Sequence, residues 1–148
     1  MSILTDGVEI LLVEDNPTDA ELAIVALKER NLANKLVWVK DGAEALDFLF
    51  ATGVYAKRNI EKPPKVVLLD LRLPKVDGLE VLRHIREDER FCNVPVVVLT
   101  TSSEDCDVHT AYQLYANSYI VKPVDFDKFV QVADRINVYW CAVNTPPR

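Results

Sequence analysis

Short apolar runs alternate along this chain with longer stretches in which apolar residues recur every three or four positions. Four of the runs have the length and the apolar character of strands that are buried on both faces of a parallel sheet. They lie at Ile10–Val13, Val66–Leu69, Val94–Leu99 and Ser118–Val121. A fifth segment, Lys35–Val39, alternates polar and apolar residues, as an edge strand does.

The stretches between these strands have the spacing of amphipathic helices. Apolar residues at i, i+3, i+4 and i+7 follow the helix-start signal Asn16-Pro17, and the same spacing recurs over 78–85 and over 108–115. Further helices are expected over Ala43–Phe50 and from near Asp125. Strand and helix thus alternate five times. This order predicts an α/β fold, a doubly wound five-stranded parallel sheet with five helices on its two faces.

Composition and charge narrow the functional classes. A length of 148 residues, with 49% hydrophobic and 27% charged residues, suits one globular domain with a substantial core. The net charge of −6 and the lack of a dense Lys/Arg run argue against direct nucleic-acid binding. No apolar run approaches the roughly 18 residues that span a bilayer, and the N-terminus lacks the pattern of a signal peptide. Three widely spaced cysteines favour a reduced, cytoplasmic protein without a disulfide framework or a zinc site.

Charged and hydroxyl side chains follow the predicted strands at the points where they end. In open parallel sheets, ligands bind outside the carboxyl ends of the strands. The residues that terminate four of the strands here are Glu14-Asp15, Asp70, Thr100-Thr101 and Lys122-Pro123. The pattern therefore predicts one site at which three carboxylates, a hydroxyl and an ammonium group meet.

Three carboxylates at one site repel one another, at a cost of about 4 kcal/mol for each pair at about 4 Å with an effective dielectric near 20. Lys122 offsets one charge, and a divalent cation would balance the remainder. Oxygen ligands favour magnesium, which suggests phosphoryl chemistry with Asp70 as the nucleophile. Simpler readings stay open for each signal: residues 14–16 as a helix cap, Thr100 as an ordinary strand residue, Lys122 as a solvated one, and Asp77-Gly78 as a turn and helix start.

The same residues, in this order and spacing, resemble the receiver domain of two-component response regulators. The strings LLVEDNP, LLDLRLPKVDG, VVVLTTS and ANSYIVKPV carry the resemblance, which runs from about Glu9 to Ile136. It implies a flavodoxin-like receiver fold with strand order 2-1-3-4-5. It also implies a phosphoacceptor signalling protein in place of a classical enzyme.

Carried over residue by residue, the resemblance makes Asp70 the phosphoacceptor. Asp15, Asp70 and the backbone carbonyl of Arg72 would hold Mg²⁺, and Glu14 would assist through a bound water.

On the phosphoryl side, Thr100 would hydrogen-bond a phosphoryl oxygen and Lys122 would pair with it. Thr100 and Tyr119 would form the switch, with Tyr119 turning inward after phosphorylation. The peptide bond between Lys122 and Pro123 is expected to be cis.

More narrowly, the chain is similar to the stand-alone regulators that serve phytochromes. The long Ala51–Pro64 loop, which we expect at the surface, and the strings KPVDFDKF and VYWCAVN carry this similarity. It implies a sensor histidine kinase of the phytochrome type as partner. We expect a single receiver domain over residues 1–148, with a core of about 9–143 and no output domain after Trp140.

The predicted last helix points to self-association. Phe126, Phe129, Val130, Ala133 and Trp140 form one apolar stripe on it, and Val132, Ile136, Tyr139 and Val143 form a second. Packing on a core needs an arc of only about 100°. A homodimer through this helix and the fifth strand would cover the rest; deeper burial of the helix is the alternative.

Two residues depart from the family pattern. Tyr115 stands where glycine is common, and we interpret it as a core residue at the end of its helix. Thr101 is larger than the usual residue and would narrow access to the site.

The sequence lacks residues that two other classes of function would need. A magnesium phosphatase would need a second acid near the nucleophile, but position 72 is arginine. A flavin or nucleotide carrier would need a phosphate-binding glycine loop, and neither GxGxxG nor GxxxxGK occurs. His84 and His109 fall on predicted helices and are expected to be solvated.

Overall fold

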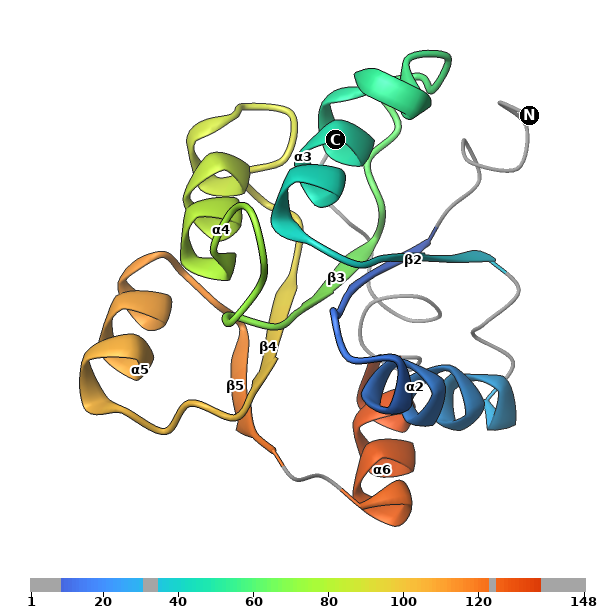
Figure 1. Ribbon diagram of the computed structural model, residues 1–148, viewed down its shortest axis with the longest axis vertical. Coiled ribbons are helices and arrows are strands. Elements are labelled where there is room, and N and C mark those ends of the chain that lie inside the picture. The colour runs from blue at the N-terminus through green and yellow to red at the C-terminus, as the bar shows by residue number, and fades with distance from the viewer. Residues whose placement is uncertain (1–8, 31–34, 123–124, 137–148) are drawn as a thin grey trace.

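The computed structural model describes residues 9–30, 35–122 and 125–136, with the side chains of 135 and 136 left aside. Five parallel strands form one sheet in the order β2-β1-β3-β4-β5, which confirms the predicted sheet order (Figure 1). The strands are β1 (Ile10–Val13), β2 (Leu36–Val39), β3 (Val66–Leu69), β4 (Val96–Thr100) and β5 (Ser118–Val121).

Helices cover both faces of this sheet. One face carries α2 (Pro17–Glu29) and α6 (Phe126–Ile136). The other face carries α3 (Gly42–Phe50), α4 (Gly78–Glu87) and α5 (Asp105–Gln113) (Figure 1). The expected alternation of strands and helices is therefore confirmed. Among the described residues, no helix has the length and the apolar character that a membrane span requires.

The central strand β3 explains why a run of four apolar residues is needed there. Val67 and Leu69 pack into the core shared with α3, α4 and α5, whereas Val66 and Leu68 pack into the core shared with α2 and α6. All four side chains are fully buried. A strand with helices on both sides has no solvent-facing positions, so polar residues are admitted only where the strand ends.

Strand β4 begins at Val96, two residues later than the apolar run predicts. Pro95 has no N–H to donate to a neighbouring strand, although its carbonyl still accepts a 2.9 Å bond from the N–H of Val67. The Val96 N–H is bonded instead by the side-chain oxygen of Asn117, at 2.8 Å.

The interpretation of Tyr115 as a core residue is wrong, because its side chain is 75% exposed. Helix α5 ends at Gln113, and Tyr115 adopts a left-handed backbone conformation with φ 59°. The guanidinium of Arg86 donates to the carbonyl oxygens of Leu114 and Tyr115, at 2.9 and 2.8 Å. This turn directs the tyrosine ring outward, so the helical spacing that places Ala111 in the core does not extend to position 115.

The segment after α3 is not a plain surface loop. It contains the short 3-10 helix η2 (Gly53–Tyr55), and it buries Arg58 to 6% exposure. The guanidinium of Arg58 lies 4.0 Å from the centre of the Phe48 ring and donates to backbone carbonyls of Phe48 and Lys62. These contacts attach the segment to the core.

Helix α6 buries Phe129 and Ala133, and Val130 and Val132 pack partly against the same core. Phe126, at the start of the helix, is 37% exposed. The residues that complete the two predicted stripes (Ile136, Tyr139, Trp140 and Val143) fall outside the described side chains. The two-stripe pattern therefore stays a prediction.

Candidate functional site

Glu14, Asp15 and Asp70 meet at the carboxyl ends of β1 and β3. One carboxylate oxygen from each residue lies within 4.8 Å of those of the other two. Glu14 and Asp70 are buried, at 4% and 6% exposure, whereas Asp15 is exposed. The predicted convergence of the three carboxylates is thus found in the structure.

The N-terminus of α2 is capped by Asn16, whose side-chain oxygen accepts from the N–H groups of Thr18 and Asp19 at 2.9 and 3.2 Å. Glu14 instead accepts a 3.2 Å bond from the N–H of Asn16 and faces the site. The capping alternative therefore applies to Asn16, and the acidic pair before it is left for other chemistry.

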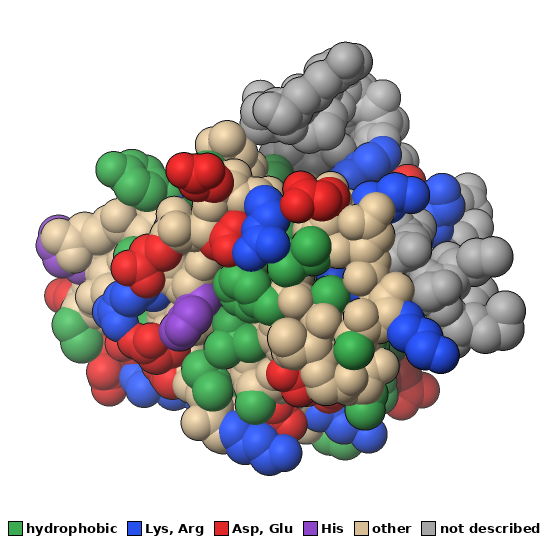
Figure 2. Space-filling view, turned by 90° about the horizontal axis from the view of Figure 1, so that it is seen from above, with side chains coloured by type: hydrophobic (Ala, Val, Ile, Leu, Met, Phe, Trp, Pro, Cys, Tyr) green, Lys and Arg blue, Asp and Glu red, His purple; other side chains and the backbone are tan. Residues whose placement is uncertain are grey.

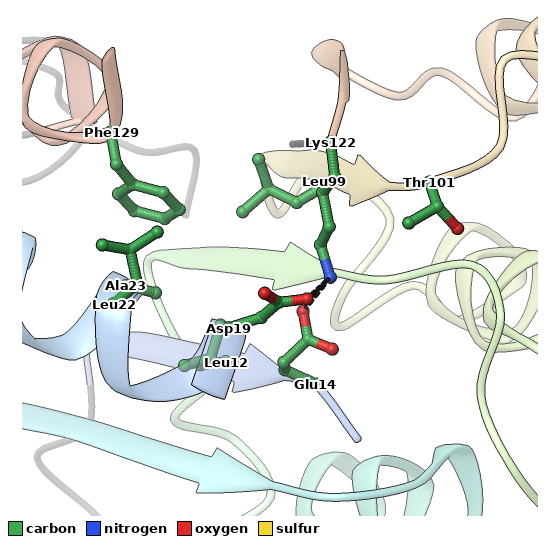
Figure 3. Close-up of a pocket in the computed structure, with 9 residues that line it drawn as sticks. All are labelled: Leu12, Glu14, Asp19, Leu22, Ala23, Leu99, Thr101, Lys122 and Phe129. Atoms are coloured by element: carbon green, nitrogen blue, oxygen red, sulfur yellow. Dashed lines mark hydrogen bonds and ion pairs between the residues drawn. The ribbon is translucent and has the colours of Figure 1, made fainter. Parts of the chain in front are cut away.

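Lys122 reaches the acidic cluster from the end of β5, so the solvated reading of this residue is wrong. Its side chain is 11% exposed, and its Nζ lies 3.2 Å from Asp70 Oδ2 and forms an ion pair with Glu14. A third partner, Asp19 Oδ2 on α2, lies 3.0 Å away (Figure 3). Burial alone would lower the pKa of Lys122, but these carboxylates outweigh it and raise that pKa above its usual value.

Burial among these charged groups changes the pKa of Glu14. Burial raises its pKa from 4.5 to about 7, although the hydrogen bond from Lys122 acts in the opposite direction and Asp70 adds to the increase. Four carboxylates with one ammonium group leave a net negative charge. A hard divalent cation fits this donor set, because every available ligand atom is an oxygen.

Trp38 positions the acidic turn from the edge strand β2, and sequence reasoning did not find it. Its indole N–H donates a 2.7 Å hydrogen bond to the backbone carbonyl of Glu14. The Glu14 N–H donates to the carbonyl of Val39 at 3.0 Å. Both backbone polar groups of Glu14 are thereby bonded to β2, which holds the start of the acidic turn in place.

Thr100 and Tyr119, the predicted switch pair, lie on the neighbouring strands β4 and β5. Thr100 is fully buried, and its Oγ1 accepts a 3.3 Å bond from the N–H of Ser102. Tyr119 is half-buried against the core, and its hydroxyl donates a 2.8 Å bond to the carbonyl of Ser102. The ring therefore already packs inward in this structure. Their roles toward a phosphoryl group, and the cis bond to Pro123, which lies outside the described residues, stay predictions.

The backbone of Arg72 contacts the site, whereas its side chain contacts helix α5. Its backbone N–H donates a 3.2 Å bond to Asp70 Oδ1, which places its main chain beside the nucleophile. Its side chain turns away toward α5 and pairs with Asp107 and, at 3.6 Å, with Glu104. The expected metal-binding role of its carbonyl stays a prediction, and the ion pair was not foreseen.

Gly78 allows the start of α4 to pack closely against β3, in addition to any role in the turn. A Cβ at this position would lie 2.3 Å from the carbonyl oxygen of Asp70 and 2.5 Å from the Cα of Leu71. The preceding Asp77 makes no side-chain capping bond to α4. The glycine is needed because the start of α4 packs directly against the backbone of the candidate nucleophile.

A cavity of about 360 Å³ lies beside the acidic cluster, between α2, α6 and the sheet. Figure 3 shows the Lys122 side chain extending toward Asp19 and Glu14, with Leu99, Phe129 and Ala23 around the apolar part of the cavity. Thr101 is exposed and lines this cavity, and the expectation that it narrows access to the site stays a prediction.

The two histidines are exposed, as expected. His84 lies on α4 and His109 on α5. On the face of the molecule shown in Figure 2, basic and acidic side chains are interspersed.

The chain is similar to known proteins in sequence and in structure. A family model described as "Response regulator receiver domain" matches residues 10–134. The probable methanogenesis regulatory protein FilR2 of Methanothrix harundinacea is 44% identical over 138 residues, which cover 93% of this chain and 86% of the relative. The Mn²⁺-bound crystal structure of response regulator Rcp1, a protein known from Synechocystis, superimposes with a TM-score of 0.81 at 37% identity, covering 94% of this chain and 98% of that one. The phosphorylated cyanobacterial phytochrome response regulator RcpA gives 0.82 at 39% identity, covering 94% and 97%.

Proposed function

This chain belongs to the response regulator receiver domain family, and on that premise we propose that it accepts a phosphoryl group on Asp70. It is a phosphoacceptor signalling protein and not a classical enzyme. The position of Asp70 in the structure is the observation that supports its role as the phosphoacceptor. Asp70 is a buried carboxylate at the end of the central strand, 3.2 Å from the Lys122 ammonium and in one oxygen cluster with Glu14 and Asp15.

The chemistry follows from this geometry. A carboxylate oxygen of Asp70 attacks the phosphorus of a phosphohistidine, the P–N bond breaks as the P–O bond forms, and the imidazole leaves with the electron pair. Lys122 neutralises charge on the phosphoryl oxygens, and the Thr100 hydroxyl donates a hydrogen bond to one of them. Little covalent chemistry is required of the protein beyond positioning and electrostatics.

We propose Mg²⁺ as the metal of this site. Asp15, Asp70 and the backbone carbonyl of Arg72 would hold it, and Glu14 would assist through a bound water. When bound, the ion supplies positive charge to the phosphoryl oxygens. The crowded carboxylates and the raised pKa of Glu14 support a cation here, because a divalent charge would relieve both.

The phosphodonor we propose is a sensor histidine kinase of the phytochrome type. The support is similarity: RcpA is described as a cyanobacterial phytochrome response regulator, and RtBRR, which is 47% identical, as a bacteriophytochrome response regulator. We also propose that residues 1–148 form one receiver domain that signals through its own surface. One cooperative unfolding transition measured over this chain would support the single domain.

The decisive experiment is incubation with acetyl phosphate and MgCl₂, followed by intact mass spectrometry. We expect the addition of one phosphoryl group that requires magnesium and is removed by hydroxylamine, as an acyl phosphate is. Asp70→Asn should abolish it without loss of fold, because the side chains are nearly the same size. Asp77→Asn is the matched control, since Asp77 is exposed and makes no capping bond. Unchanged labelling of Asp70→Asn would refute the assignment, and turnover of an aryl phosphate would favour a phosphatase instead.

We further propose a homodimer through β5 and α6. Val121 on β5 is 42% exposed and Phe126 on α6 is 37% exposed, which gives this side an apolar surface among the described residues. The test is sedimentation of the parent and of Ile136→Glu combined with Tyr139→Glu, with and without phosphorylation. A parent that stays monomeric at tens of micromolar in both states would overturn the proposal.

A further inference from the structure

Ser102, in the segment between β4 and α5, touches both members of the predicted switch pair. Its N–H donates to Thr100 Oγ1 at 3.3 Å, and its carbonyl accepts from the Tyr119 hydroxyl at 2.8 Å. Any displacement of Ser102 therefore moves a partner of both residues. The Ser102 hydroxyl donates to Asp107 Oδ2 at 2.5 Å and lies 3.5 Å from Nη2 of Arg72.

Asp107 is a buried carboxylate, at 8% exposure, in the first turn of α5. The same Oδ2 atom is paired with the guanidinium of Arg72, which also lies 3.6 Å from Glu104. A buried carboxylate is stable only when it is hydrogen-bonded and paired. Glu104 adds a further negative charge close by, and among the described residues Arg72 is the cation that pairs with Asp107.

We propose that Arg72 is a positioning residue, which acts through Asp107 and Ser102 to hold Thr100 and Tyr119 in the arrangement that receives the phosphoryl group. This inference rests on the proposed phosphorylation of Asp70. It extends that proposal by assigning a role to the side chain two residues after the nucleophile. Because Tyr119 already packs against the core, the network stabilises the inward position of its ring before phosphorylation.

The expected effect is moderate. Arg72 has 52% of its side chain exposed, so water competes for its guanidinium. Couplings between sites usually change an equilibrium by about 5- to 150-fold, and a half-exposed ion pair belongs at the lower end. We therefore expect phosphorylation to slow by about fivefold when the network is broken.

The test measures the rate of phosphorylation by acetyl phosphate, at saturating magnesium, in the full chain. The variants are Arg72→Ala, Asp107→Ala and the two combined. If Arg72 acts through Asp107, both single variants slow the reaction by a similar factor and the double variant is no slower than either. Arg83→Ala is the matched control, because Arg83 forms a half-exposed ion pair with Glu80 on the surface of α4.

The two charges allow a simpler explanation to be separated. If Arg72 acted only through its field at Asp70, its removal and the removal of Asp107 would shift the rate in opposite directions, because one takes away a positive and the other a negative charge. That result would overturn the proposal. So would an effect of Arg72→Ala with none from Asp107→Ala.

A second measurement does not depend on phosphorylation. Hydrogen exchange of the backbone amides at 102–107 should quicken in both single variants and stay unchanged in Arg83→Ala. Should Asp107→Ala unfold, Asp107→Asn replaces it, since it keeps the size and weakens only the ion pair. Exchange at the parental rate in both variants would overturn the proposal. A parent that takes up no phosphoryl group would instead refute the role of Asp70.

Discussion

Gly78→Ala should damage the site through the backbone, without touching any side chain of the acidic cluster. The added Cβ would lie 2.3 Å from the Asp70 carbonyl oxygen, 2.5 Å from the Leu71 Cα and 3.0 Å from the Asp70 carbonyl carbon. To reach an ordinary contact of 3.4 Å, the added Cβ and the Asp70 carbonyl oxygen must move apart by about 1 Å. Since all three atoms belong to the main chain, either α4 or the end of β3 must move.

Two effects of opposite sign decide how far Gly78→Ala changes the free energy of unfolding. Replacing a glycine restricts the unfolded chain and stabilises the folded protein by about 0.4–1 kcal/mol when the new side chain fits. Overpacking costs about 1–3 kcal/mol, and contact with backbone belongs at the upper end. The net expectation is a loss of about 2 kcal/mol in the free energy of unfolding, or roughly 4–8 °C in Tm for a chain of this size.

Urea denaturation gives the loss of stability, and the acetyl phosphate assay gives the effect on Asp70. The control is Gly53→Ala, at a glycine whose backbone has φ 59° and whose Cβ would meet only the movable Asp47 carboxylate. The control should lose about 1–2 kcal/mol from the left-handed conformation but keep the parental rate of phosphorylation. A Gly78→Ala protein that is as stable as the parent, or that is phosphorylated at the parental rate, would contradict this account of the packing.

Three further outcomes are expected. Tyr115→Gly should stabilise the protein by about 1 kcal/mol in urea denaturation, because the ring is exposed and the left-handed backbone favours glycine. Burial and the 2.9 Å hydrogen bond to Glu44 raise the pKa of Tyr55 to about 12. The stability from its neutral phenol is therefore complete below pH 10 and is lost as pH rises through about 12. In a spectrophotometric titration, Tyr55→Phe should remove a tyrosine step near pH 12. Asp15→Asn should weaken magnesium binding, measured by calorimetry, more than Glu14→Gln does. Equal affinities would contradict a direct role for Asp15 and an indirect one for Glu14.

The sequence by itself determined the order of strands and helices and the charged residues at the strand ends. Four-residue apolar runs between helical patterns indicate strands covered on both faces, and β3 is completely buried in this way. Once the strands are parallel, their carboxyl ends share one edge. Asp70, Glu14 and Lys122 then meet there whatever the details of the loops.

The tertiary structure decided which of these groups touch and what else joins them. Asp19 enters the site because α2 brings it to Lys122, which is 103 positions later in the chain. Trp38 joins through a backbone carbonyl, and a carbonyl leaves no trace in the residue types. Ser102 is an ordinary loop serine until Thr100 and Tyr119 are both found bonded to it.

Tyr115 shows the physical reason for this division. Hydrophobic periodicity reports the faces of a regular helix, and it fails where the backbone leaves the helix. At position 115 a single dihedral, φ 59°, turns an apolar side chain from the predicted core into solvent. Patterning fixes elements and edges because it sums over many residues. Individual contacts depend on a few dihedral angles and on partners far away in the chain, which only the folded structure specifies.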